Sequence, residues 1–235
     1  MKILAFDGTA KAASVAVLDG ERVLGYYTVD NGLTQSELLL PMAENLLKSL
    51  KLSFSDIELF ATSVGPGSFT GVRIGVSLIK GLAFGKNIPC AEVSTLEALA
   101  ESLSGIRGLI VPCMDARRQQ VYSATFISDG KEMKRLCEDR AVSLASLADE
   151  LRDKDEDIWL VGDGYSVAKA AMAREGVEVM NTPELLVLES AVSVGKVALK
   201  KYENGEFVSD SELSPVYLRL PQAERERLER EAAKQ

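Results

Sequence analysis

The stretch SVGPGSFTGVRIG, residues 63–75, predicts a strand that runs through a glycine-rich loop into a helix. An apolar run, residues 59–64, leads into the loop, and an apolar helical pattern continues after it to residue 84. Backbone amides that open a helix commonly bind anions, because the helix dipole adds to their partial charge. The stretch therefore indicates an α/β fold, and it raises the possibility of a phosphate site.

Known nucleotide loops set stricter requirements than this stretch meets. A P-loop requires G-x-x-x-x-G-K-[ST], and neither Lys-Ser nor Lys-Thr follows the second glycine here. Gly65, Gly67 and Gly71 are spaced G-x-G-x-x-x-G, whereas the dinucleotide fingerprint is G-x-G-x-x-G. Arg73, in the first turn of the expected helix, fits either an anion or an ion pair with a carboxylate. Two interpretations stay open at this point, an anion loop and a tight turn.

The composition excludes several classes of function. The chain has 235 residues, 46% of them hydrophobic, which is enough for one large core or two small ones. It contains no histidine, which excludes Ser-His-Asp triads, Cys-His pairs and histidine metal sites. A net charge of −8 disfavours autonomous nucleic-acid binding, which depends on Lys and Arg at phosphates. Three scattered cysteines without a CxxC pair and the lack of a long apolar run indicate a cytoplasmic protein with no membrane span.

The two halves of the chain repeat one pattern. Asp7 and Asp115 each end an apolar run, and each is followed by a turn, another strand and an Asp-Gly hairpin signal. Acidic residues at duplicated junctions can face one another across a cleft and organise Mg²⁺. Alternatively, each caps its own turn. The duplication favours the cleft.

The expected fold is α/β, with two similar lobes over residues 1–105 and 106–235. Each lobe is expected to hold a mixed sheet of a five-stranded type, flanked by helices. The sequence leaves open whether the C-terminal helix packs back on the first lobe. The expected elements are strands at 3–6, 13–18, 23–29, 59–64, 109–115, 121–126, 158–161 and 177–180, helices at 35–50, 71–84, 166–175 and 184–203, an extended segment at 215–218 and a solvated helix from Ala223.

Two helices of the first lobe carry more apolar surface than a single core stripe requires. In the first, Thr34 and Glu37 fit a capping box, and the apolar residues spread over roughly 200°, where one stripe needs about 100°. The second contains three glycines, which helix propensity does not favour. Either both helices are deeply buried, or they also pack on another protein. The residues expected at such an interface are Leu38, Leu39, Met42, Leu46, Gly71, Val72, Gly75 and Ile79.

The chain resembles the TsaB family of bacterial threonylcarbamoyladenosine biosynthesis proteins, within the actin, sugar-kinase and Hsp70 (ASKHA, ribonuclease H-like) fold superfamily. The resemblance covers nearly the whole chain, in family order. It is carried by the segments ILAFDGT, QSELLLPM, GPGSFTGVRIGVSLIKGLA, DARRQQVY, GDG and PVYLR. Many family members have histidine where this chain has Gln35, a departure that bears on the local helix cap.

The resemblance implies a duplicated actin-like fold and a non-catalytic scaffold subunit. TsaB proteins resemble inactive relatives of TsaD, which modifies adenosine 37 of tRNA and holds its metal with a histidine pair. The implied partners are TsaD in a direct heterodimer through the two helices, and TsaE, with tRNA reached only through the complex. A homodimer is expected when TsaD is absent. The chain is expected to have no metal site and no required cofactor, although weak or interface-bound ATP or ADP with Mg²⁺ is compatible with the fold.

The turn after Asp115 adds to this expectation. It reads Ala-Arg-Arg-Gln, whose side chains would hinder the close backbone approach that phosphate needs. Asp7, Gly65, Gly67, Ser68, Arg73 and Asp115 are therefore expected to form a vestigial nucleotide or anion site. The rival interpretation is an active ATP-dependent phosphotransferase or ATPase of the same fold, with Asp7 and Asp115 at its metal.

Overall fold

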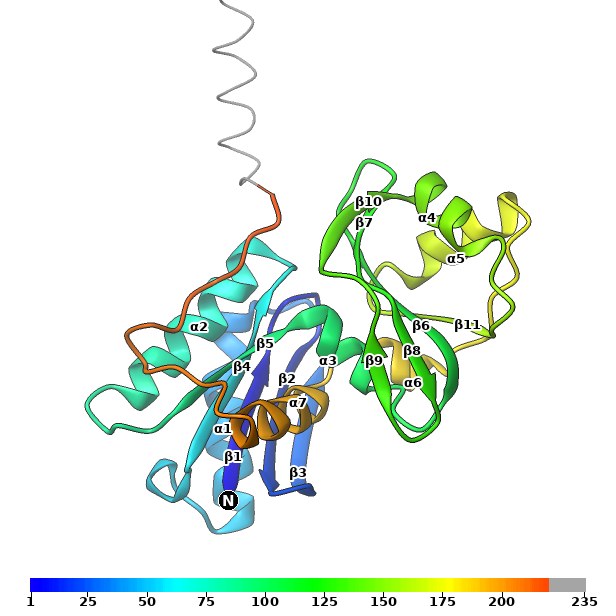
Figure 1. Cartoon of the computed structure of the whole chain (residues 1–235). Helices are drawn as coiled ribbons and strands as arrows, with labels where there is room; N and C mark the ends of the chain where they lie inside the picture. Colours follow the sequence, from blue (N-terminus) through cyan, green and yellow to red (C-terminus); the bar gives the residue numbers. More distant parts are fainter. Residues whose placement is uncertain (220–235) are drawn as a thin grey trace, which may run out of the picture.

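A computed structural model describes residues 1–219 and shows two lobes, each built on its own sheet (Figure 1). The first sheet has the strand order β3-β2-β1-β4-β5. Its first three strands form an antiparallel meander, and β1, β4 and β5 run parallel. The four expected strands of this lobe are confirmed, and a fifth strand, β5, was not predicted. The bounds are β1 Lys2–Asp7, β2 Ala13–Asp19, β3 Arg22–Val29, β4 Leu59–Gly65 and β5 Cys90–Ser94.

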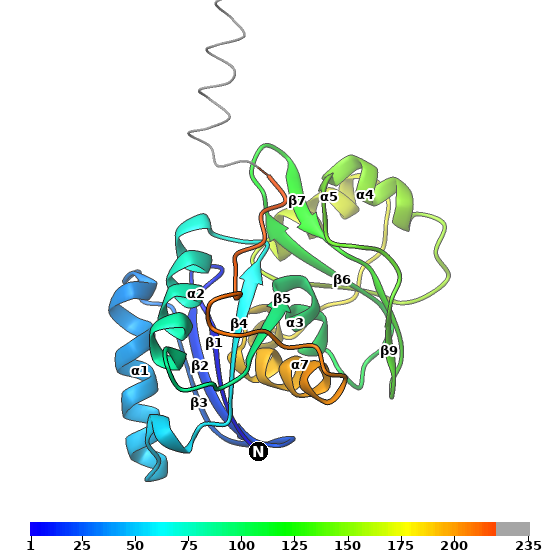
Figure 2. The same cartoon turned by 60° about the vertical axis from the view of Figure 1, so that its left-hand side comes forward.

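Helices cover both faces of the first sheet (Figure 2). Strand side chains point alternately to opposite faces, and nearly every residue of β1 and β4 is buried, most of them apolar. One face packs on α1 (Gln35–Leu50) and α2 (Phe69–Ala83), and the other packs on α7 (Ala191–Glu203). Burial on both faces explains the near-continuous apolar runs that predicted these strands.

The second sheet has the order β10-β7-β6-β8-β9, and β11 pairs in parallel with β6, so this sheet has six strands instead of five. Helices α4 (Leu144–Leu151) and α5 (Tyr165–Arg174) pack against it. Strand β6 has an antiparallel neighbour, β7, and a parallel one, β11, just as β1 of the first lobe pairs with β2 and β4. The strands are β6 Arg107–Asp115, β7 Gln120–Ser123, β8 Phe126–Asp129, β9 Met133–Arg135, β10 Arg140–Ser143 and β11 Ile158–Val161.

The prediction of one continuous strand over residues 121–126 is wrong, because the structure has two strands there. β7 ends at Ser123, and β8 begins at Phe126 in the same register against β6. That register places Ala124 opposite Pro112, which has no amide hydrogen for the ladder. A second expected strand, residues 177–180, does not form. The segment makes one backbone hydrogen bond to β11, from Met180 N to Ile158 O at 2.8 Å.

The helix expected over residues 184–203 is interrupted. A short helix, α6 (Glu184–Val187), ends before an extended break, and α7 begins at Ala191 with Ser190 as its N-cap. The break carries the chain from the second lobe back to the first. The predicted division at residue 105 separates the two sheets, but α7 and the segment after it lie with the first sheet. The expected helix from Ala223 lies outside the described residues.

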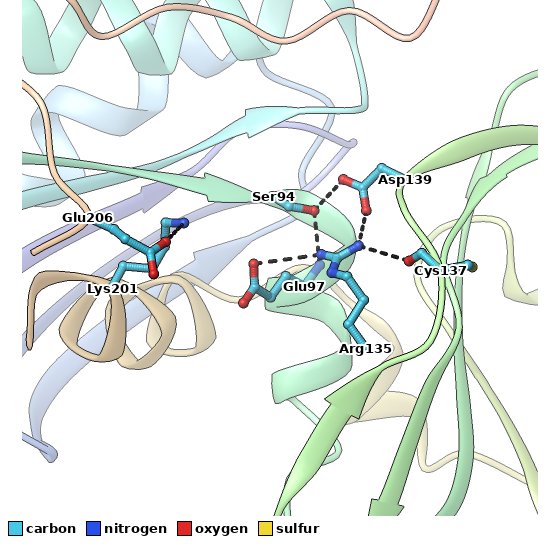
Figure 3. A network of polar contacts seen from close by, with 7 residues as sticks. All are labelled: Ser94, Glu97, Arg135, Cys137, Asp139, Lys201 and Glu206. Atoms are coloured by element: carbon cyan, nitrogen blue, oxygen red, sulfur yellow. Dashed lines mark hydrogen bonds and ion pairs between the residues drawn. The ribbon is translucent and has the colours of Figure 1, made fainter. Parts of the chain in front are cut away.

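The lobes are joined by α3 (Thr95–Glu101) and by a polar network. The side chains of α3 pack on the second sheet through Leu96 and Leu99, and Ala98 packs on the first lobe. Beside it, Asp139 accepts from Ser94 Oγ and from Arg135 Nη1, each at 2.5 Å (Figure 3). These contacts bring the end of β5 and the loop after β9 together.

Candidate functional site

The glycine-rich loop packs on the turn that follows β1. Ser68 N donates to Thr9 O at 2.7 Å, and a Cβ on Gly67 would lie 2.6 Å from the same oxygen. A Cβ on Gly71 would lie 1.9 Å from Gly8 O. These glycines therefore let two backbones approach each other within the chain. The amides of Ser68 and Gly71 are therefore already bonded within the chain, the second one to Ser68 Oγ at 3.3 Å.

The buried carboxylate of Asp7 holds the turn after β1 through hydrogen bonds. Its Oδ1 accepts from Thr9 N at 2.9 Å and from Thr9 Oγ1 at 2.7 Å, and its Oδ2 accepts from Ser63 Oγ at 2.6 Å. The side chain is buried, and burial raises its pKa above the ordinary value, although the three hydrogen bonds oppose this shift. Both carboxylate oxygens are thus engaged in holding the turn, as in the capping interpretation.

Asp115 has a similar local task in the second lobe. It accepts from Arg117 N at 2.8 Å and from Arg117 Nη1 at 3.1 Å. Arg117, Arg118 and Gln119 have φ of 63°, 54° and 58°, a left-handed run that non-glycine residues adopt at a cost. The bulky turn noted in the sequence is therefore also an unusual backbone.

A cleft of about 410 Å³ lies between the lobes at these two turns. Thr9, Gly67 and Ser68 line one side, and Asp115 and Asp163 line the other. Asp7 does not line the cleft, because it is buried beneath the turn. The two acidic residues that the sequence paired are therefore not equivalent: only Asp115 faces the cleft. Within residues 1–219 no group of three or more Cys, Asp or Glu side chains is placed to hold a metal ion, and no helix there could span a membrane.

A C-terminal strap, residues 207–219, crosses the mouth of this cleft. Val216 N donates to Val64 O at 2.7 Å, and a Cβ on Gly65 would lie 2.4 Å from Val216 O. Further along, Arg219 Nη1 donates to Ala116 O at 3.0 Å, which ties the strap to the second lobe. The strap thus covers the loop that the sequence offered as a phosphate cradle.

Glu189, which lies in the break between α6 and α7, was not singled out by any sequence motif. It is 2% exposed, its Oε1 accepts from Asp163 N at 3.3 Å, and its Oε2 has no partner. Burial, together with the charges of Asp7 and Asp163, raises its pKa to about 8. Glu189 is therefore harder to ionise than an ordinary glutamate, and it lies where the chain crosses between the lobes.

An apolar groove of about 540 Å³ lies between α1 and α2 on the outer side of the first lobe. We call it the docking groove. Its lining residues are Gln35, Ser36, Leu39, Leu40, Phe69, Thr70, Arg73, Ile74, Ser77 and Leu78. Leu40 is 37% exposed there, and Ile74 and Leu78 are half-buried. The two helices thus have an outward apolar surface in addition to the face that packs on the sheet.

Most residues expected at a partner interface lie on the inner face of these helices instead. Gly71 and Gly75 approach Gly8 O and Thr62 Oγ1, so they serve packing within the lobe. Leu38 is partly buried against the core. Leu39, Met42, Leu46, Val72 and Ile79 are core residues, and of these only Leu39 reaches the lining of the docking groove.

Arg73 forms part of the wall of the docking groove. Its guanidinium carbon lies 3.8 Å from the centre of the Phe69 ring, and its Nε donates to Tyr217 Oη at 2.8 Å. The Phe69 and Tyr217 rings are themselves 4.8 Å apart. The strap therefore reaches the docking groove as well as the cleft.

Comparisons with known proteins show the family of the chain. A family model described as TsaD, tRNA N6-adenosine threonylcarbamoyltransferase, matches residues 34–226. The tRNA threonylcarbamoyladenosine biosynthesis protein TsaB of Escherichia coli strain K12 is 32% identical over 93% of this chain and 95% of its own length. The chain belongs to the TsaB family. Because the TsaD model covers most of the chain, this TsaB-family chain also belongs to the wider family that the model describes.

Solved structures extend the comparison to the fold. The structure of YeaZ from Pseudomonas aeruginosa is 27% identical, has a TM-score of 0.76, and covers 92% of this chain and 99% of its own. The activator of 2-hydroxyisocaproyl-CoA dehydratase from Clostridium difficile, solved with bound ADPNP, is 14% identical, with a TM-score of 0.50 over 92% of this chain and 100% of its own. The second likeness concerns the fold alone. The duplicated actin-like fold expected for a TsaB-family chain is confirmed.

Proposed function

We propose that the chain is a non-catalytic scaffold subunit in bacterial tRNA N6-threonylcarbamoyladenosine biosynthesis, acting on position 37 of tRNA. It pairs directly with TsaD through the docking groove and helps to recruit TsaE, and it meets tRNA only through the complex. The name of its TsaB relative and the match to the TsaD model support this assignment. The proposal places the chain in the cytoplasm.

The docking groove is the observation that carries the proposal. An amphipathic helix packs its single apolar face on the core, whereas α1 and α2 also expose Leu40, Ile74 and Leu78 along the groove between them. An apolar groove between two helices fits a helix of a partner, because ridges of one helix pack into grooves of another. Two helices of a related subunit would supply such ridges.

The absence of catalysis rests on separate observations. The chain has no histidine for a metal pair like the one its TsaD relatives are expected to use. The amides of Ser68 and Gly71 and both carboxylate oxygens of Asp7 are bonded within the chain, and the strap crosses the cleft. The proposal therefore requires no metal and no nucleotide, and any ATP or ADP with Mg²⁺ would bind weakly or at the interface with TsaD.

Charge placed in the docking groove tests the proposal. We expect Leu40→Arg and Ser77→Arg to abolish co-elution with TsaD, because each buries a charge against an apolar partner. Both positions are exposed, so the fold should persist. Asn45→Arg adds the same charge to an exposed site on α1 outside the groove and should co-elute normally. Undiminished co-elution of both groove variants would overturn the assignment.

The function itself is tested by reconstituting tRNA modification from TsaD, TsaE, ATP, an activated threonylcarbamoyl donor and tRNA, with and without this chain. We expect product only when the chain is present, and the Ser77→Arg variant should fail to replace it. Calorimetry of the purified chain with Mg-ATP, together with a turnover assay, tests the rival phosphotransferase. Hydrolysis that is lost in Asp115→Asn would favour that rival.

The same groove bears on the oligomeric state. We propose that two copies pair through it when TsaD is absent, because an exposed apolar groove favours any partner that covers it. Light scattering should show a dimer that is replaced by a heterodimer when TsaD is added. A monomer in isolation would contradict this part of the proposal.

A further inference from the structure

The side chain of Arg73 is held in one orientation before any partner arrives. Phe69 lies under the guanidinium, and Tyr217 accepts from Nε at 2.8 Å. Tyr217 itself is fixed, because Val216 beside it is bonded to β4. An arginine held in this way loses little side-chain freedom on binding, which lowers the entropy cost of an interaction.

The bond made by Nε leaves the two terminal nitrogens of the guanidinium as the available donors. Arg73 is exposed, and within residues 1–219 it forms no ion pair with a carboxylate. These two nitrogens form a planar fork that matches the two oxygens of a carboxylate. The fork therefore presents a pre-oriented site for an acidic group.

The surroundings of Arg73 indicate a protein as the source of that group. Arg73 lines the docking groove and not the cleft, and its neighbours in the groove are Phe69, Thr70 and Ile74. A single arginine beside an apolar groove, on a chain with a net charge of −8, is a poor nucleic-acid site. Stacked arginine and aromatic side chains next to an apolar patch are, in contrast, typical of binding hot spots.

We propose that Arg73 is the polar anchor of the docking groove and takes up a carboxylate of the TsaD partner through two parallel hydrogen bonds. This inference rests on the function proposed above and adds to it. The strap thereby becomes part of the binding surface, because Tyr217 orients the anchor. Arg73 determines the register of the partner in the groove, whereas the apolar residues supply contact area.

Calorimetric titration of TsaD with four forms of the full chain tests the anchor. Arg73→Lys keeps the charge but loses the fork and the stack, and it should weaken binding by at least about tenfold. Tyr217→Phe keeps the ring and loses the bond to Nε, so it should weaken binding by a few-fold. Arg174→Lys, an exposed arginine on α5, is the matched control and should bind like the unmodified chain. Melting temperatures should be alike for all four forms.

The outcomes separate the anchor from the function. If Arg73→Lys binds TsaD normally while Ser77→Arg does not, the anchor is overturned and the proposed function stands. If neither variant affects binding, the docking groove itself is overturned. A chain ending at residue 219 provides a third arm. The Arg73→Lys penalty should persist in it, and loss of that penalty would show that the fork serves the chain's own tail, which overturns the proposal.

Discussion

Gly71 and Gly81 lie on the same helix, yet only Gly71 packs closely against another part of the backbone. A Cβ on Gly71 would lie 1.9 Å from Gly8 O, whereas a Cβ on Gly81 would meet nothing within 4 Å. We expect Gly71→Ala to lower the free energy of unfolding by about 1–3 kcal/mol or more, because the backbone must move. Gly81→Ala should raise it by up to about 1 kcal/mol, because alanine favours helix. Urea denaturation measures both, and equal effects would contradict the packing described here.

Glu189 makes stability depend on pH. Its pKa is about 8 in the folded chain and 4.5 as the ordinary value. Between these values the unfolded state binds fewer protons than the folded state, so the free energy of unfolding falls as pH rises. Glu189→Gln removes this ionisation. We expect the variant to gain stability over the unmodified chain progressively from pH 4.5 to about 8, and to keep a constant advantage above that range.

Urea denaturation over a pH series measures this difference. Glu178→Gln, an exposed position in the second lobe, is the matched control and should show no such trend. If the difference between Glu189→Gln and the unmodified chain were the same at every pH, the buried acid would not be the cause.

At the residue scale, the sequence predicted interactions between nearby residues better than it predicted which distant residues a side chain contacts. Thr34 and Glu37 were expected to form a capping box, and they do so, whereas Ser68, expected in an anion loop, caps α2. Arg73 was offered for an anion, and it lies at the groove wall because Tyr217, remote in sequence, holds it there. Glu189 lies in a segment that reads as helix, so nothing local distinguishes it from a solvated glutamate. Such pairings depend on the tertiary fold and have no local signal.

The strap contributes to the stability of the first lobe although it has almost no regular secondary structure. Leu213 is nevertheless fully buried in the core of the first lobe, while Val216 is 47% exposed. We expect Leu213→Ala to cost about 2–5 kcal/mol through lost burial and a residual cavity. Val216→Ala keeps the backbone bond to Val64 and should cost little. Thermal unfolding of the two variants provides the comparison, and similar melting temperatures would contradict a structural role for Leu213.

Elements with a strong local signal were predictable. The helix at 35–50 has its predicted bounds, and Thr34 N donates to Glu37 Oε2 at 3.0 Å, as a capping box requires. The break at 188–190 was missed because its apolar spacing continues the helical period. The inner and outer faces of α1 and α2 could not be separated either, since both faces are apolar and only the position of the sheet distinguishes them.

At the scale of the whole molecule, the polar network around Asp139 links the two lobes beside the apolar contacts of α3. Asp139→Ala removes the bond from Ser94, which joins β5 of the first lobe to the loop after β9, and the bond from Arg135 within the second lobe (Figure 3). We expect a loss of roughly 1–2 kcal/mol, since the pair is partly exposed to solvent. Amide hydrogen exchange should also become faster where β5 meets α3, because the lobes separate more often.

A control for this prediction lies on α4. Asp149 pairs with Arg152 at 2.9 Å within the second lobe, so Asp149→Ala removes an ion pair without loosening the lobes. Exchange near β5 should be unchanged in that variant. Faster exchange in both variants, or in neither, would show that the network does not join the lobes.

The return of α7 to the first sheet has a consequence for how the chain folds during synthesis. When the ribosome has produced residues 1–105, one face of the first sheet still lacks the helix that covers Ile3, Ala16 and Leu59. The whole second lobe emerges before α7 does, which takes on the order of ten seconds at typical rates of translation. The nascent chain therefore exposes a large apolar surface during that interval. The lobe made first is completed last, and chaperones that bind exposed apolar segments have their main opportunity then.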